Sequence, residues 1–210
     1  MNLGIIPCDN GLGHIFRSIE LANILSKKFK VTLYLSKNSK HFLIDRKVSI
    51  KKISTNFKLL RNNNYNTNWY KNIKQEDLKK IDILISDNLP EAVFLNKKII
   101  LYANFFWHEI FNKNNHFIRL LKREIIKRNV KILSNYLFSN ITYFKQNIHK
   151  IGFIGKYRNQ NISKKKGILI SLGNSKIGYK NNFEKSLKVL KNPKFNKYIF
   201  YLDRNLFKKK

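Results

Sequence analysis

Short apolar runs alternate along this chain with segments that carry a helical pattern. Several of the runs are continuous over four or five residues, as is typical of parallel strands covered on both faces. The strands predicted in this way are Leu3–Pro7, Val31–Leu35, Val48–Ile53, Ile83–Ser86, Ile99–Tyr102, Tyr136–Phe138 and Ile151–Ile154. Helices are predicted between them, over Ile15–Lys27, Lys71–Lys80 and Phe117–Leu133. The alternation predicts an α/β, Rossmann-like domain with a parallel sheet.

The opening pattern of strand, glycine loop and helix returns late in the chain. A polar and charged segment at 157–166 is typical of a linker. A buried-strand run at 167–172, a glycine loop at 173–178 and a helical pattern at 182–190 follow it. We therefore expect an N-terminal domain over 1–156, a linker over 157–166 and the start of a second α/β domain over 167–210. This second domain is expected to be partial, because a domain typically has about 100 residues.

The net charge of +31 invites a nucleic-acid interpretation. Only eight of the 43 basic residues are arginine, the residue that nucleic-acid sites favour for its bidentate geometry. Lysine, asparagine and isoleucine share A/T-rich codons, so codon bias is one explanation of the excess, and a functional basic surface is the other. We therefore expect no nucleic-acid partner, although some attraction to anionic surfaces should remain.

The remaining composition bears on where the protein works. A single cysteine allows no internal disulfide, which fits a reducing compartment. There is no signal-peptide pattern and no apolar run near the ~18 residues of a membrane span. We therefore expect a cytoplasmic protein.

The first glycine loop carries a histidine where a strand gives way to a helix. Gly11 and Gly13 would let a ligand approach the backbone closely, and the start of the following helix attracts anions. The same helix end disfavours a protonated imidazole, so His14 should be able to accept a proton. The alternative is that both glycines only make a tight turn and His14 caps the helix.

Common cofactor motifs do not fit this loop. A dinucleotide fingerprint needs a third glycine where Phe16 stands, and an acid at the end of the second strand, where 33–38 has none. There is no P-loop, and the five histidines show no metal-ligand spacing. We expect neither a cofactor nor a metal.

Polar residues follow two later strands. Asp87 and Asn88 come directly after Ile83–Ser86, and His108 comes shortly after Ile99–Tyr102. Residues at the carboxyl ends of parallel strands point into the binding crevice. The alternatives are helix capping by Asp87 or Asn88, and an aromatic segment before His108 that only fills the core.

These motifs together resemble a known family. "GLGHIFRSIELANIL" is similar to the first loop and helix of GT-B glycosyltransferases of the MurG-like type, and to the related nucleotide-sugar hydrolase of pseudaminic acid synthesis. "DILISDNLPEAV" and "ILYANFFWHEI" resemble later strand-end loops of that N-terminal domain. "ILISLGNSKIG" resembles the loop that opens the donor-binding domain.

The resemblance implies a role for each matching residue. His14 would be the catalytic base, or would orient the acceptor hydroxyl or water. The residues facing the donor phosphates would be Gly11, Gly13, Gly173 and Ser175. The residues at the acceptor or lining the cleft would be Asn10, Arg17, Asp87, Asn88 and His108.

The expected activity is transfer of a sugar from a nucleotide-sugar donor to a glycan or lipid-linked acceptor. In the nearest alternative, a hydrolase, water replaces the acceptor; a further alternative is a non-catalytic binder of anionic surfaces or RNA. A basic stripe formed by Arg119, Arg123, Lys127 and Lys131 is consistent with contact between the enzyme and an anionic membrane. An ordinary amphipathic surface helix is the simpler interpretation of the same stripe.

Overall fold

A computed structural model describes most of the first three quarters of the chain and two short strands beyond it. The described residues are 1–8, 12–36, 44–53, 69–95, 97–106, 116–136, 139, 141, 147–152, 154, 168–170 and 200–202. The chain divides into two compact units, Met1–Lys156 and Tyr157–Lys210. The predicted linker at 157–166 and the predicted helix at 182–190 lie outside the described residues.

The first unit is built on a seven-stranded sheet in which every pairing is parallel. Its strands are β1 (Asn2–Pro7), β2 (Lys30–Ser36), β3 (Val48–Ile53), β4 (Ile83–Asp87), β5 (Lys98–Tyr102), β6 (Lys131–Asn135) and β7 (Ile148–Ile151). The helical elements are α1 (Leu12–Leu25), the 3-10 helix η1 (Trp69–Asn72), α2 (Gln75–Leu78), the 3-10 helix η2 (Pro90–Phe94) and α4 (His116–Lys127). The predicted α/β, Rossmann-like fold is confirmed.

The strand order places a topological switch between β1 and β4. The order is β3-β2-β1-β4-β5-β6-β7, so the chain winds from β1 to one side of the sheet first and then crosses to the other. In open α/β sheets a crevice forms outside the carboxyl ends of the strands at such a switch point. The residues after β1 and at the end of β4 therefore flank the place where such folds bind ligands.

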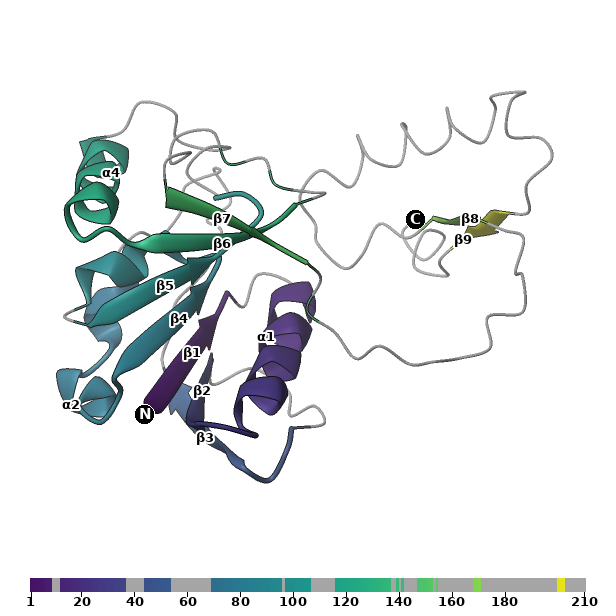
Figure 1. The fold of residues 1–210 in the computed structure, drawn as a ribbon, viewed down its shortest axis with the longest axis horizontal. Coiled ribbons are helices and arrows are strands. Elements are labelled where there is room, and N and C mark those ends of the chain that lie inside the picture. Colours follow the sequence, from purple (N-terminus) through teal and green to yellow (C-terminus); the bar gives the residue numbers. More distant parts are fainter. Residues whose placement is uncertain are drawn as a thin grey trace, which may run out of the picture. The chain divides into compact units, whose positions relative to one another are not determined.

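Helices cover both faces of this sheet, as Figure 1 shows: α1 packs on one face, and α2 and α4 lie on the other. α1 turns Ile15, Ile19 and Ala22 inward, and all three are buried against strand residues such as Leu3 and Leu33. Their spacing of four and three residues keeps them on one helical face. This packing fixes the rotation of α1, and with it the directions of the residues in its first turns.

Two of the predicted elements were wrong in the same region. The helix predicted over Phe117–Leu133 ends earlier, and β6 begins at Lys131 rather than at the predicted Tyr136. The cause is Asn129, which adopts a positive φ of 47°. Its amide bonds to Ile126, and the amide of Val130 bonds to Ile125. This is a Schellman ending, in which a left-handed residue terminates the helix.

Smaller differences concern two other elements. Instead of one helix over Lys71–Lys80, the chain forms η1 and the short α2, separated by Lys74 in an extended conformation (ψ 132°). The last strand of the sheet lies at Ile148–Ile151 rather than Ile151–Ile154. Both predictions had the right region but the wrong boundaries.

Gly4 lies in β1 at a point where the core leaves no room for a side chain. A Cβ atom there would stand 2.8 Å from Leu84 Cδ1 and 3.1 Å from Tyr34 Cε2. Gly4→Ala is therefore expected to destabilise the first unit by about 1–3 kcal/mol, the usual cost of overpacking. Gly13→Ala is the matched control, because nothing lies within 4 Å of its added methyl. Urea unfolding that ranks the two variants equally would contradict this packing.

The second unit is described through two strands. β8 (Ile168–Ile170) and β9 (Phe200–Leu202) pair in parallel, and β8 falls on the strand run predicted at 167–172. Among the described residues, no helix has both the length and the apolar character needed to cross a membrane.

Candidate active site

A cluster of polar side chains lies at the switch point of the sheet. Its centre is the carboxylate of Asp87, the last residue of β4. β1 and β4 pair so that Pro7 lies opposite Asp87, and the amide of Cys8 donates to the Asp87 carbonyl at 2.9 Å. The helix that follows β1 therefore begins beside this carboxylate. His14 lies in its first turn, and Arg17 and Ser18 follow on the next.

Four side-chain atoms from α1 surround the two oxygens of Asp87. The Arg17 guanidinium binds both oxygens: Nε donates to Oδ2 at 2.8 Å and Nη2 donates to Oδ1. The Ser18 hydroxyl also donates to Oδ2, at 2.9 Å. His14 Nδ1 lies 3.0 Å from Oδ1. The carboxylate is thus fully engaged by one helix, which fixes the register between α1 and β4.

This arrangement keeps Asp87 ionised although it is only 1% exposed. Burial alone would raise the pKa of Asp87. The hydrogen bonds from Arg17 and His14, together with the positive charge of Arg17, outweigh burial and hold the pKa of that carboxyl below its ordinary value of 3.8. Burial also disfavours the charged form of Arg17 and so tends to lower the pKa of its guanidinium. The hydrogen bond to Asp87 and the negative charge of Asp87 outweigh burial and raise that pKa above its ordinary value. The pair is a buried, bidentate ion pair.

Arg17 is held from a second side by Tyr102, the last residue of β5. Its guanidinium carbon lies 4.3 Å from the centre of the Tyr102 ring, in a cation–π contact. Burial raises the pKa of the Tyr102 hydroxyl, although the Arg17 charge opposes this. Arg17 therefore bridges two strand ends and has little freedom to move.

The His14 ring is partly open to solvent. Its side chain is 15% exposed, and its hydrogen-bond contacts both involve Nδ1, with Asp87 and with Arg17 Nη2 at 3.0 Å. Within the part of the chain that the structure describes, Nε2 has no hydrogen-bond partner. The ring is therefore anchored through one nitrogen while the other is available to a ligand.

The structure brings together some of the residues predicted to form the site. His14, Arg17 and Asp87 are in direct contact. Gly13 is exposed in the first turn of α1. Asn88 follows Asp87, but it is 1% exposed and has a φ of 60°, with its amide bonded to the Tyr102 carbonyl at 2.8 Å. The predicted site residues that lie outside the described part of the chain are Asn10, Gly11, His108, Gly173 and Ser175.

For Asp87, the capping alternative is not what the structure shows. η2 begins at Pro90, and its N-cap residue is Leu89, which makes no side-chain cap hydrogen bond. The Asp87 carboxylate turns to α1 instead.

Sequence reasoning missed two members of the cluster, Ser18 and Tyr102. Tyr102 ends a buried strand, as Asp87 does, so the strand-end rule that selected Asp87 could also have selected it. Ser18 carries no comparable signal, because a serine inside a helix usually bonds locally or faces water. Within the described residues, no three histidine, cysteine, aspartate or glutamate side chains are grouped in a way that could hold a metal ion.

Comparison with known proteins gives a likeness in structure only. No protein-family model matches the chain. No curated protein matches it either.

Two solved glycosyltransferase structures are similar to this chain. The structure of Phytolacca americana UGT2, complexed with UDP-2fluoro-glucose and pterostilbene, is 13% identical with a TM-score of 0.50, over 90% of this chain and 64% of that one. The glycotransferase of kitacinnamycin is 12% identical with a TM-score of 0.46, over 100% of this chain and 67% of that one. This chain thus spans less than two thirds of UGT2. At this identity, the likeness to UGT2 shows that the chain has the α/β fold of GT-B glycosyltransferases.

Proposed function

We propose that the protein is a GT-B-type glycosyltransferase that moves a sugar from a nucleotide-sugar donor to an acceptor hydroxyl. The observation that carries this proposal is the His14 imidazole, which is fixed through Nδ1 by a buried carboxylate and keeps Nε2 available. It lies at the switch point of a sheet whose fold resembles that of UGT2, a protein solved with UDP-2fluoro-glucose. His14 is the proposed base of the reaction.

The charge on Asp87 favours one tautomer of His14. Nδ1 can either donate to Asp87 Oδ1 or accept from Arg17 Nη2. Because an ionised carboxylate is a stronger acceptor than a neutral ring nitrogen, we propose that Nδ1 carries the hydrogen and donates it to Oδ1. In that tautomer Nε2 carries the free lone pair. The arrangement matches the general pattern of a base oriented by a third group.

In the proposed transfer, His14 accepts the proton and the leaving nucleoside diphosphate takes the electron pair. The acceptor hydroxyl gives its proton to Nε2 while its oxygen forms a bond to the anomeric carbon. The bond from that carbon to the phosphate oxygen breaks, and the nucleoside diphosphate leaves with the electron pair. The imidazolium formed on His14 lies beside Asp87, which stabilises it, before the proton passes to solvent.

The start of α1 is the proposed contact for the donor phosphates. Free amides and the positive end of a helix attract phosphate. Gly13 is exposed there, and a Cβ atom added to it would meet nothing within 4 Å, so a ligand can come close to this backbone. Gly11, Gly173 and Ser175, which lie outside the described residues, remain predictions of the sequence for donor contacts.

The proposal is tested by measuring nucleoside diphosphate release from UDP-sugars by the full-length protein, with and without acceptor hydroxyl compounds. We expect release that depends on His14 and a glycoside as the product. Release accompanied only by free sugar would identify the hydrolase instead. Saturable UDP-sugar binding with no release under any condition would contradict an enzymatic role.

We also propose that the protein works in the cytoplasm at the inner membrane surface, on a lipid-linked acceptor. The support is the outer face of α4, where Arg119, Arg123 and Lys127 are exposed and Ile126 is 50% exposed. Lys131, expected in the same stripe, lies in β6 instead. Basic residues around an exposed apolar side chain suit an anionic membrane surface.

Vesicle flotation tests this membrane contact. Arg119→Gln/Arg123→Gln should lower recovery with phosphatidylglycerol vesicles, because each basic residue near such a surface contributes about 1 kcal/mol. Lys27→Gln/Lys28→Gln removes the same charge from another exposed site and should have little effect. Equal losses would assign the attraction to net charge alone.

A further inference from the structure

A basic pocket lies at the amino ends of the strands, whereas His14 lies at their carboxyl ends. It encloses about 280 Å³ among residues at the start of β4, β5 and β6 and residues that follow the end of α4. β4 and β5 run from this pocket to Asp87 and Tyr102 at their other ends, so the two sites are separated by the length of the strands. The residues that line the pocket are Ile83, Lys97, Lys98, Ile99, Ile100, Arg128, Asn129, Val130 and Lys131.

The proportion of basic residues is higher in the lining of this pocket than in the whole chain. Four of its nine lining residues are basic and none is acidic, whereas basic residues make up 43 of the 210 in the chain. Lys98 and Lys131 are exposed, and within the described residues neither has an acidic partner. The positive charges of Lys98 and Lys131 are therefore not neutralised at this point, whereas Arg128 pairs with Glu124.

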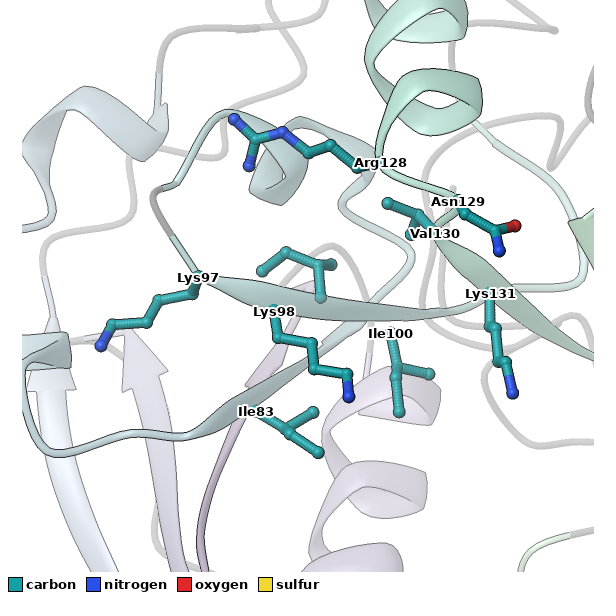
Figure 2. A pocket seen from close by; sticks show the side chains of 9 residues that line it. Ile83, Lys97, Lys98, Ile100, Arg128, Asn129, Val130 and Lys131 are labelled. Atoms are coloured by element: carbon teal, nitrogen blue, oxygen red, sulfur yellow. The ribbon is translucent and has the colours of Figure 1, made fainter.

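The sheet register brings those two lysines to one face. Lys98 pairs with Ile83, and Lys131 pairs with Ile100, which lies two residues after Lys98. Residues two apart in a strand share a face, so both ammonium groups flank Ile100 on the same side. Figure 2 shows their side chains pointing in the same direction on either side of Ile100. Two ammonium groups thus lie on one face of the sheet, on either side of the Ile100 side chain.

Arg128 is held in a fixed position at the rim of the pocket. Its Nη1 donates to the Leu95 carbonyl at 3.1 Å, and its Nε donates to Glu124 at 3.2 Å. The Schellman ending at Asn129 sets the turn that connects Arg128 to Lys131. These contacts order the rim before any ligand arrives, which lowers the entropic cost of binding.

We propose that this pocket is an anion site that binds a phosphate-bearing group. Its volume is near the lower end of the ~300–1,000 Å³ of ligand pockets, which suits a small charged group rather than an extended ligand. Lysine ammonium groups bind phosphate as point charges, and the pocket offers several of them without a competing carboxylate. A free phosphate compound and a lipid headgroup share this chemistry.

The test is calorimetric titration of the full-length protein with inorganic pyrophosphate. Lys98→Gln/Lys131→Gln should weaken binding at least about tenfold, since two charge-assisted contacts are lost. Lys27→Gln/Lys28→Gln removes the same net charge from an exposed site elsewhere and should change binding less than about twofold, an effect of net charge alone. Activity at the His14 site should be unchanged in both variants.

A parallel arm with phosphatidylglycerol vesicles distinguishes the two sources of phosphate. If vesicle binding, but not pyrophosphate binding, depends on the Lys98 and Lys131 pair, the ligand is a lipid headgroup; the reverse result assigns a free phosphate compound. Equal losses in both double variants, or no saturable binding in either arm, would overturn the proposal.

Discussion

Replacing Asp87 by alanine is expected to destabilise the first unit by about 3–5 kcal/mol, the usual cost of breaking a buried ion pair from one side. The substitution leaves the Arg17 guanidinium partly buried with no carboxylate, and it removes the acceptor of Ser18. It also detaches the start of α1 from the end of β4. Urea unfolding of the variant gives the change directly.

Two further variants show whether the unpaired charge of Arg17 causes this loss of stability. Asp82→Ala removes an exposed carboxylate that accepts from the Asn2 amide, and it should cost no more than about 1 kcal/mol. The double variant Arg17→Met/Asp87→Ala should cost less than the sum of its single variants, because neither charge is then left alone. Additive losses, or a cost for Asp87→Ala as small as for Asp82→Ala, would contradict the account.

The same ion pair predicts how stability changes with pH. The pKa of Asp87 is lower in the folded protein than its ordinary value of 3.8, so the folded state binds fewer protons near that pH. Its contribution is therefore present above about pH 4 and is lost as the pH falls through the lower, folded value. Arg17→Gln should be less stable than the natural protein at neutral pH, and this gap should narrow in acid. Unfolding curves with a constant gap would contradict this linkage.

Replacing His14 by alanine is expected to slow sugar transfer by about 10²–10⁴-fold, the usual contribution of a general base. Donor binding should change little, because the imidazole acts on the acceptor proton rather than on the nucleotide. Stability should also change little, since the ring is partly exposed and Asp87 keeps its bonds to Arg17 and Ser18. His149→Ala, at an exposed histidine of β7, is the matched control. Equal rates in the two variants would remove His14 from the reaction.

The apolar runs of the sequence predicted most of the sheet because buried parallel strands need side chains of one kind on both faces. They failed around β6, where a helical pattern continues past Asn129 into residues that form the strand. An asparagine after Lys127 and Arg128 is a recognised helix stop, and it was the available signal. The mistake came from following periodicity through a left-handed residue.

The site was predictable in its parts but not in its contacts. The strand-end rule selected Asp87, and the glycine loop drew attention to His14, yet the two are 73 residues apart in the chain. Only the pairing of β1 with β4 brings them together. Nothing in the sequence shows that Arg17 would use both ends of its guanidinium on the same carboxylate, because that depends on the rotation of α1 set by Ile15 and Ile19.

The central claim is that Asp87 holds His14 with its hydrogen on Nδ1 and leaves Nε2 free to take a proton. The ¹⁵N spectrum of histidine-labelled protein, recorded at mildly alkaline pH, reports which ring nitrogen carries the hydrogen. We expect a protonated-type Nδ1 and an unprotonated Nε2 for His14, and a loss of this preference in Asp87→Asn. A spectrum showing the hydrogen on Nε2, with Nδ1 accepting from Arg17, would contradict the proposed base.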